Sequence, residues 1–179
     1  INTVIAMLCY QEERLYFDNP TFKKITTTYL ITMIGSPRRE TYMYQLNKYR
    51  PTKNVIILHN PGYKICEKTH VLKSTSDIWH ANKEVCERTK YIPEPILILE
   101  DDVVFLPSFI ENAAEIESFI LTSGVEMYAL GCIPIFNSIF PTKTHHYKIY
   151  KAAMSHAIIY SNKARNIILE TQKNNIDID

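Results

Sequence analysis

The most constraining feature of the sequence is the apolar run Ile96 to Leu99, which ends in three consecutive acidic residues, Glu100, Asp101 and Asp102. An uninterrupted apolar run of this length, introduced by prolines, is typical of a central β-strand that is buried on both faces. We therefore expect an α/β domain built around this strand. Ligands of open α/β sheets bind beyond the carboxyl ends of the strands, which is where these acids stand.

The rest of the chain alternates between short apolar segments and longer amphipathic ones. This alternation predicts a mostly parallel central sheet with helices on both faces. Ser36 suits the N-cap and Pro37 the first turn of the helix over 39–49. Residues 11–24 are expected to form a loop or short helix, and residues 132–150 an irregular segment. The predicted strands are 3–9, 26–34, 54–59, 96–99, 127–130 and 157–160, and the predicted helices are 39–49, 78–90, 107–123 and 162–173.

Length and composition bound the class of protein. The 179 residues suit one catalytic-sized domain over 1–179, and a chain that opens on Ile1 is also compatible with a fragment of a longer protein. A formal net charge of +1 argues against nucleic acid as a partner. No apolar stretch approaches the roughly 20 residues of a transmembrane helix. We therefore expect neither a nucleic-acid partner nor a transmembrane segment in this chain.

The four cysteines, Cys9, Cys66, Cys86 and Cys132, are far apart in the sequence and include no CxxC pair. This spacing does not indicate a zinc site, and a disulfide framework is not expected in a chain of this length. We therefore predict that the cysteines are buried free thiols.

Three adjacent carboxylates after a buried strand repel one another and are costly to desolvate without a counter-charge. A divalent cation removes both problems, and oxygen ligands suit Mg²⁺ or Mn²⁺. Because side chains at i and i+2 share a face of a strand, Glu100 and Asp102 should point together. We expect Asp102 to bind the metal, Glu100 to act beside it, and Asp101 to brace the loop or complete the site. The competing interpretation, a solvated acidic turn, fits poorly with the apolar flanks.

The string Ile98 to Val103 resembles the metal-binding DxD-type motif of GT-A fold glycosyltransferases. More narrowly, it resembles the family of bacterial lipooligosaccharide galactosyltransferases and collagen-type galactosyltransferases, in which a hydrophobic strand ends in Glu-Asp-Asp. A proline-containing helix start follows in that family, as Pro107 does here. The segment Ala153 to Ser161 is similar to a later strand of those enzymes. The two matches lie within residues 96–169, less than half of the chain.

This resemblance implies a GT-A, Rossmann-like fold and a nucleotide-sugar donor, with UDP-sugar favoured over GDP-sugar. It also implies a Mn²⁺ or Mg²⁺ ion and transfer of the sugar to a hydroxyl of a glycan, glycolipid or glycoprotein. A cation across the diphosphate neutralises the charge that develops as the glycosidic bond breaks, which gives Asp102 a catalytic part.

The same resemblance places the loop after residues 26–34 against the nucleotide. Ser36, Arg38 and Arg39 are then candidates to contact the diphosphate, because guanidinium groups and helix N-termini favour phosphate. The alternative is a solvated basic helix start. Asp77 is a candidate nucleotide contact, although a plain N-cap is the favoured interpretation for it.

Late residues supply the remaining candidates. His156, just before an apolar strand, is either a third metal ligand or sugar contact, or a core histidine. Asp177 and Asp179 are candidates by position for the base that an inverting enzyme needs. A retaining enzyme needs no such base.

Three other functions compete with sugar transfer. Acidic clusters on α/β sheets also serve carboxylate-metal phosphotransferases and nucleases. A non-catalytic relative would bind a nucleotide or glycan without turnover, and a purely structural domain would bind neither.

Overall fold

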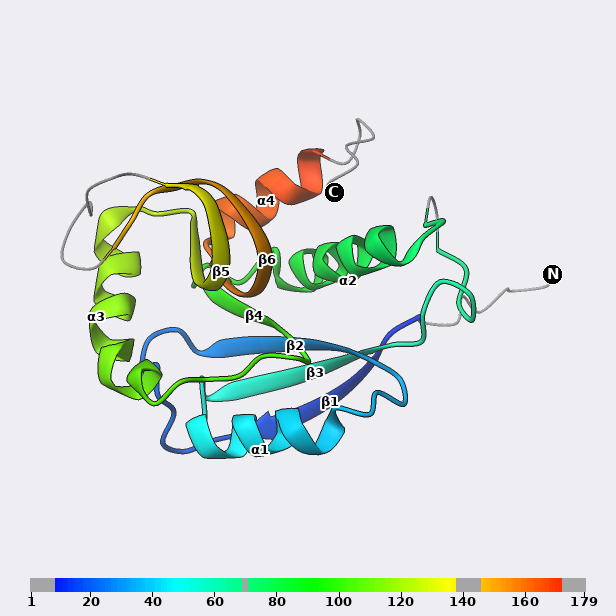
Figure 1. Cartoon of the computed structure of the whole chain (residues 1–179), viewed down its shortest axis with the longest axis horizontal. Coiled ribbons are helices and arrows are strands. Elements are labelled where there is room, and N and C mark those ends of the chain that lie inside the picture. Colours follow the sequence, from blue (N-terminus) through cyan, green and yellow to red (C-terminus); the bar gives the residue numbers. More distant parts are fainter. Residues whose placement is uncertain (1–8, 69–70, 138–145, 172–179) are drawn as a thin grey trace.

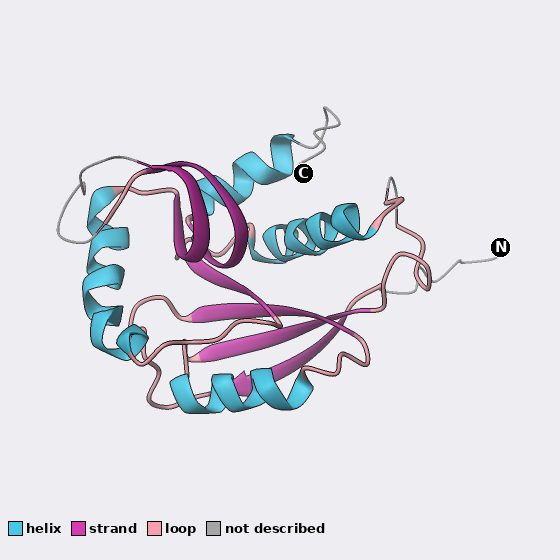
Figure 2. Cartoon of the chain, viewed as in Figure 1, coloured by secondary structure: helices cyan, strands magenta, loops and turns pink. Residues whose placement is uncertain are grey.

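The computed structural model describes residues 9–68, 71–137 and 146–171, without the side chains of 133, 137 and 152–155. This part of the chain is an α/β protein with one six-stranded sheet and four helices (Figures 1 and 2). None of the described helices has the length and apolar character needed to cross a membrane. The elements in chain order are β1 (Gln11–Tyr16), β2 (Thr27–Met33), α1 (Arg39–Tyr49), β3 (Asn54–Asn60), α2 (Ser74–Thr89), β4 (Ile96–Glu100), α3 (Ser108–Ser123), β5 (Met127–Asn137), β6 (Ile149–Tyr160) and α4 (Asn162–Thr171).

The sheet is mixed, with the strand order β1-β3-β2-β4-β6-β5. β2 pairs in parallel with β3 and with β4, whereas β1 and β6 pair antiparallel with β3 and β4, and β5 pairs antiparallel with β6. The prediction of a mostly parallel sheet is therefore wrong. Helical crossovers through α1 and α2 join the three central strands, which pair in parallel. Helix α3 also connects β4 to β5, but β6 lies between these two strands and pairs antiparallel with both.

The helices cover both faces of the sheet, as predicted, and β4 shows how they divide its side chains. Leu97 and Leu99 pack in a cluster with residues of α1 and α3, whereas Ile96 and Ile98 pack in a second cluster with residues of α2 and α4. Figure 1 shows α1 on one side of the sheet and α2 and α4 on the other. Because consecutive side chains of a strand face opposite ways, a strand buried on both faces is apolar at every position.

Several predicted boundaries change. The strands over 26–34, 54–59 and 96–99 and the helix over 39–49 are confirmed, as is the helix that follows Pro107 and ends at Gly124, whose φ is 69°.

The loop predicted for residues 11–24 is wrong over β1, a charged edge strand that pairs with β3. β5 and β6 extend into the segment predicted to be irregular, and α2 begins at Ser74 rather than Ile78. Residues 3–8 of the first predicted strand lie outside the described residues.

The helix starts also differ from prediction. Arg38, not Ser36, occupies the N-cap of α1, and its side chain makes no capping hydrogen bond. Lys73 occupies the N-cap of α2, so the favoured interpretation of Asp77 as a plain N-cap is wrong. Ser36 and Asp77 both use their side chains elsewhere, as described below.

The prediction of four free thiols is wrong for one pair. Cys9 and Cys66 form a disulfide across 57 residues of sequence, whereas Cys86 and Cys132 are free. The bridge ties the segment before β1 to the connection between β3 and α2. Sequence spacing alone does not encode such a pairing, because it depends on how two distant segments pack.

Candidate metal centre at the carboxyl end of β4

The acidic run lies where β4 leaves the sheet. β4 ends at Glu100, and the backbone turns over Asp101 and Asp102, closed by a hydrogen bond from the Val103 N–H to the Glu100 carbonyl at 3.1 Å. The neighbouring strand β6 runs antiparallel to β4, with Ala157 opposite Leu99. This register brings the residue before Ala157, His156, to the end of β4.

Glu100, Asp102 and His156 come together at this point. Each offers one ligand atom, and the three atoms lie within 4.8 Å of one another. His156 Nδ1 is 3.1 Å from Asp102 Oδ1 and 3.3 Å from Glu100 Oε2. We call these three residues the triad.

The spacing of the triad fits a divalent cation. Cis ligands of an octahedral ion lie √2 times the metal–ligand distance apart, which is about 3.0 Å for ligands at about 2.1 Å. The two distances from His156 Nδ1 are close to this value, and they are also those of direct hydrogen bonds or ion pairs between the imidazole and the two carboxylates. Two carboxylates and one imidazole would occupy three positions and leave the others for phosphate oxygens or water. The imidazole favours Mn²⁺ over Mg²⁺, which prefers oxygen ligands.

The electrostatics of Glu100 point the same way. Burial raises the pKa of its carboxyl above the ordinary value; His156 lowers it, and the charges of Asp102 and Asp101 raise it further. Each triad side chain keeps about a third of its surface exposed, so a ligand can reach all three. A bound cation would offset the repulsion between the carboxylates.

Asp101 turns away from the triad and holds the loop between β2 and α1. Its Oδ2 accepts hydrogen bonds from Thr32 Oγ1 at 2.8 Å and Ser36 Oγ at 2.7 Å, and its Oδ1 accepts one from Arg38 Nη1 at 2.9 Å. Burial raises the pKa of Asp101, but the three donors outweigh burial, and the pKa lies below its ordinary value. The expected bracing role of Asp101 matches these contacts.

The two candidate arginines have different positions. Arg38 pairs with Asp101 and keeps 56% of its side chain exposed next to the acidic run. Arg39 instead forms two hydrogen bonds with the Glu13 carboxylate on β1, each 2.9 Å long. Arg38 is therefore the better placed of the two to meet a phosphate group at the triad.

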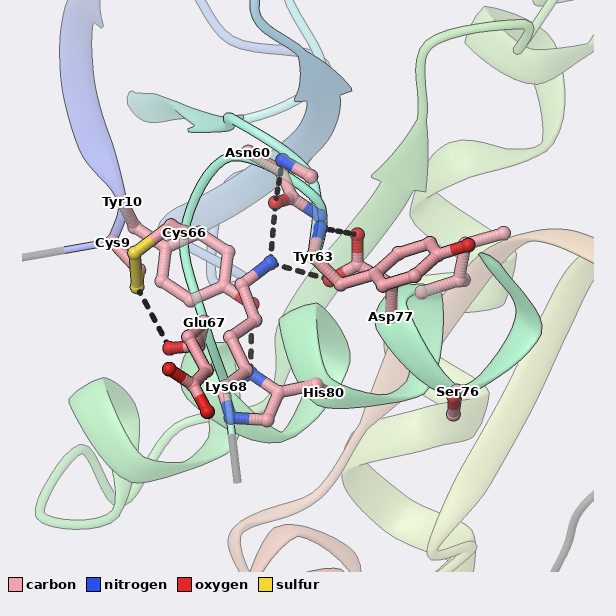
Figure 3. Close-up of polar contacts among 12 residues, drawn as sticks. Cys9, Tyr10, Asn60, Tyr63, Cys66, Glu67, Lys68, Ser76, Asp77 and His80 are labelled. Carbon is pink, nitrogen blue, oxygen red and sulfur yellow. Dashed lines mark hydrogen bonds and ion pairs between the residues drawn. A yellow bond between two sulfur atoms is a disulfide. The ribbon is translucent and has the colours of Figure 1, made fainter. Parts of the chain in front are cut away.

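Asp77 is occupied inside the protein (Figure 3). Its carboxylate accepts the Tyr63 N–H at 3.0 Å and pairs with the ammonium group of Lys68, whose side chain is 1% exposed. Lys68 also donates to Asn60 Oδ1 at 2.6 Å. This network joins the end of β3 to the start of α2 and explains why Asp77 is buried. The structure therefore places Asp77 in a fold-stabilising network, not in an open site.

A cavity of about 520 Å³ lies against the triad. Asp102 and His156 form part of its lining, together with residues of α3, β5 and the segment between β4 and α3. Sequence reasoning missed this cavity, because its walls come from segments that are distant in sequence. The one available signal was the set of apolar residues directly after the acidic run.

Asp177 and Asp179, the candidates for a catalytic base, lie outside the described residues.

No family model and no curated protein matches the chain. The function is therefore inferred from the geometry of the triad and from the motif resemblance.

Proposed function

We propose that this protein is a metal-dependent glycosyltransferase that moves a sugar from a nucleotide-sugar donor, most simply a UDP-sugar, to an acceptor hydroxyl. One observation carries the proposal: Glu100, Asp102 and His156 converge at the carboxyl end of a central strand with the spacing of cation ligands. In α/β sheets this edge is where nucleotide ligands bind.

Each side chain at the site has a separate part in the proposal. Glu100, Asp102 and His156 would hold Mn²⁺, which supplies neutralising charge for the diphosphate leaving group. Asp101 acts as a positioning residue, because it fixes the β2–α1 loop through Thr32 and Ser36. Arg38, held by Asp101 and exposed on its other side, would donate hydrogen bonds to phosphate oxygens.

The cavity supports transfer rather than phosphoryl chemistry alone. A phosphotransferase needs space for a phosphate and its acceptor, but it does not need a mostly apolar cavity beside the cation. A pocket of this volume is in the range that takes a small organic ligand. A carboxylate-metal phosphotransferase and a non-catalytic nucleotide-binding protein remain the alternatives, and both share the cation site.

The first experiment measures binding. The melting temperature of the protein is recorded with Mn²⁺ plus UDP, GDP or CMP. The measurement compares wild type with Asp102→Asn and with the control Glu111→Gln, which alters an exposed residue of α3. A nucleotide at about 100 times its Kd should stabilise the wild type by about 2.7 kcal/mol. We expect one nucleotide to give a Mn²⁺-dependent shift that the control keeps and Asp102→Asn loses. A folded protein that shows no shift with any nucleotide contradicts the proposal.

The second experiment measures chemistry. The diphosphate form of the preferred nucleotide is quantified after incubation of its sugar conjugates with the protein and Mn²⁺. Release of nucleoside diphosphate from the conjugate supports sugar transfer or its hydrolytic side reaction. Binding without release supports the non-catalytic alternative. Release of nucleoside monophosphate and sugar phosphate instead supports the phosphotransferase, because cleavage of the diphosphate bond leaves one phosphate on each product.

A further inference from the structure

Four parts of the chain line the cavity beside the triad. α3 contributes Phe109 and Ile116, β5 contributes Leu130, and β6 contributes Ala157. The segment between β4 and α3 forms the remaining wall. Because Asp102 and His156 also line the cavity, it is continuous with the proposed cation site.

Most of the described residues that line the cavity are apolar. Of the fourteen lining residues that the structure describes, four are polar, namely Asp102, Ser108, Asn112 and His156, and two of these belong to the triad. A sugar ring or a nucleoside placed here would bury several hydroxyl groups with few partners, and each unsatisfied group costs about 1–3 kcal/mol. The lining suits a group that carries no hydrogen-bonding atoms.

The wall next to the triad has a buried row and an exposed row. Val103 and Phe105 are less than 8% exposed and belong to the main core cluster, so packing holds the buried side of this wall in place. Val104 and Leu106 alternate with them and are 64% and 66% exposed. These two exposed apolar side chains thus line the same cavity as Asp102. Apolar side chains that line a pocket are the usual contacts of an organic ligand.

We propose that this cavity binds the apolar group that carries the acceptor hydroxyl, so that the acceptor is a hydroxyl compound with an alkyl or aryl portion. This inference rests on the proposed function, because the hydroxyl would be presented to a donor held at the triad. The apolar portion lies against Val104, Leu106 and Phe109, and the polar end faces Asp102 and His156. The cavity excludes water from the apolar portion and orients the hydroxyl toward the cation site.

The test uses two probes that differ only in the alkyl chain, octyl β-D-glucoside below its micelle-forming concentration and methyl β-D-glucoside. Binding of each is measured by calorimetry with Mn²⁺ and the nucleotide that stabilises the protein. We expect octyl glucoside to bind at least about tenfold more tightly, because its added methylenes leave water. Leu106→Asp should abolish this advantage. The control Ile110→Asp alters an apolar residue of α3 that is 54% exposed and outside the lining, and it should keep the advantage.

Val104→Asp provides a second variant at the same wall, and circular dichroism checks that each variant is folded. Equal binding of the two glucosides to a protein that binds Mn²⁺ and nucleotide overturns the apolar subsite and leaves the proposed function standing. An octyl advantage that survives both Leu106→Asp and Val104→Asp also overturns it, because the probe then binds elsewhere. Octyl binding by a protein that takes up no nucleotide overturns the acceptor role together with the proposed function.

Discussion

The imidazole Nδ1 of His156 lies 3.1 Å from Oδ1 of Asp102, although His156 belongs to β6 and Asp102 to the turn after β4. The antiparallel register of β4 and β6 creates this proximity, because it sets Ala157 opposite Leu99. The side chains meet at the carboxyl end of β4. Both remain about one third exposed. A ligand site explains this placement better than fold stability does.

Removing either member of the pair should weaken cation binding. On the proposed function, we expect His156→Ala and Asp102→Asn each to lower Mn²⁺ affinity by at least about tenfold, since the first removes the proposed nitrogen ligand and the second removes the charge of the proposed oxygen ligand. The measurement is Mn²⁺ titration followed by electron paramagnetic resonance. Glu111→Gln, which removes a carboxylate of α3 outside the triad, should bind Mn²⁺ as the wild type does. Wild-type affinity in His156→Ala would exclude the imidazole as a ligand.

Asp101 should affect stability more than cation binding. Asp101→Asn removes the charge of the carboxylate that accepts hydrogen bonds from Thr32, Ser36 and Arg38. It also replaces one accepting oxygen with an NH₂ group, which can only donate. We expect a loss of about 1–3 kcal/mol in the free energy of unfolding, because Asp101 is 9% exposed and its partners lose a charged acceptor. Urea denaturation measures this loss, and the Mn²⁺ titration should change by only a few-fold. A stable variant that loses Mn²⁺ affinity would instead make Asp101 a ligand.

The central strand and its acids were predictable because both signals are local. An apolar residue at every position of Ile96 to Leu99 indicates burial on two faces, and the structure confirms it. The opposite directions of Asp101 and its two neighbours were also predicted. Alternation along the strand explains these directions only in part, because Asp101 and Asp102 lie in a turn beyond the strand.

Other features depend on contacts between distant segments and were not predictable. β1 carries Gln11, Glu12, Glu13 and Arg14 in sequence, so its apolar signal is weak. Charged residues are common on edge strands, because they discourage pairing with another chain. The antiparallel flanks, the cavity and the disulfide likewise arise from packing that no local pattern records.

The Cys9–Cys66 disulfide should contribute measurably to stability. It closes a long loop, with a sequence separation of 57, and so restricts the unfolded chain. We expect reduction to lower the free energy of unfolding by about 2–4 kcal/mol. Urea denaturation with and without reductant measures the change. A Cys9→Ser/Cys66→Ser variant should have the stability of the reduced protein and should not respond to reductant.

Thiol counting checks the same bond directly. The denatured, unreduced protein should expose two reactive thiols, from Cys86 and Cys132. Four reactive thiols in protein kept under oxidising conditions would contradict the bridge.

The buried pair of Lys68 and Asp77 should be costly to break from one side. Their side chains are 1% and 6% exposed, and Lys68→Met would leave a buried carboxylate without its counter-charge. We expect a loss of about 3–5 kcal/mol, and we expect Lys68→Met/Asp77→Leu to recover a large part of it. Chemical denaturation measures both changes.

An exposed ion pair provides the matched control for this prediction. Lys163 pairs with Glu126 at the surface, with side chains 73% and 42% exposed. Lys163→Met should therefore cost about 0–1 kcal/mol. Equal losses in Lys68→Met and Lys163→Met would show that the Lys68 pair is not buried in solution.

The Glu13 carboxylate should make stability depend on pH in acid. Hydrogen bonds from Arg39 are the largest influence on the pKa of Glu13, and with His59 they lower it below the ordinary value of 4.5 despite partial burial. A carboxyl whose pKa is lower in the folded state stabilises the fold above its unfolded pKa. That contribution disappears as the pH falls through the folded pKa.

The difference in melting temperature between wild type and Glu13→Gln should therefore be at its full size at about pH 5, where the Glu13 carboxyl is charged in both the folded and the unfolded protein. Below about pH 4.5 it should shrink, because the wild-type carboxyl becomes protonated and loses its charge-assisted bonds with Arg39. Other acidic groups titrate in both proteins, so the difference isolates Glu13. The check is a series of thermal melts from pH 7 to pH 3, with Glu111→Gln as the control for removal of one charge. A difference that grows as the pH falls below about 4.5 would reverse the sign and exclude a lowered pKa for Glu13.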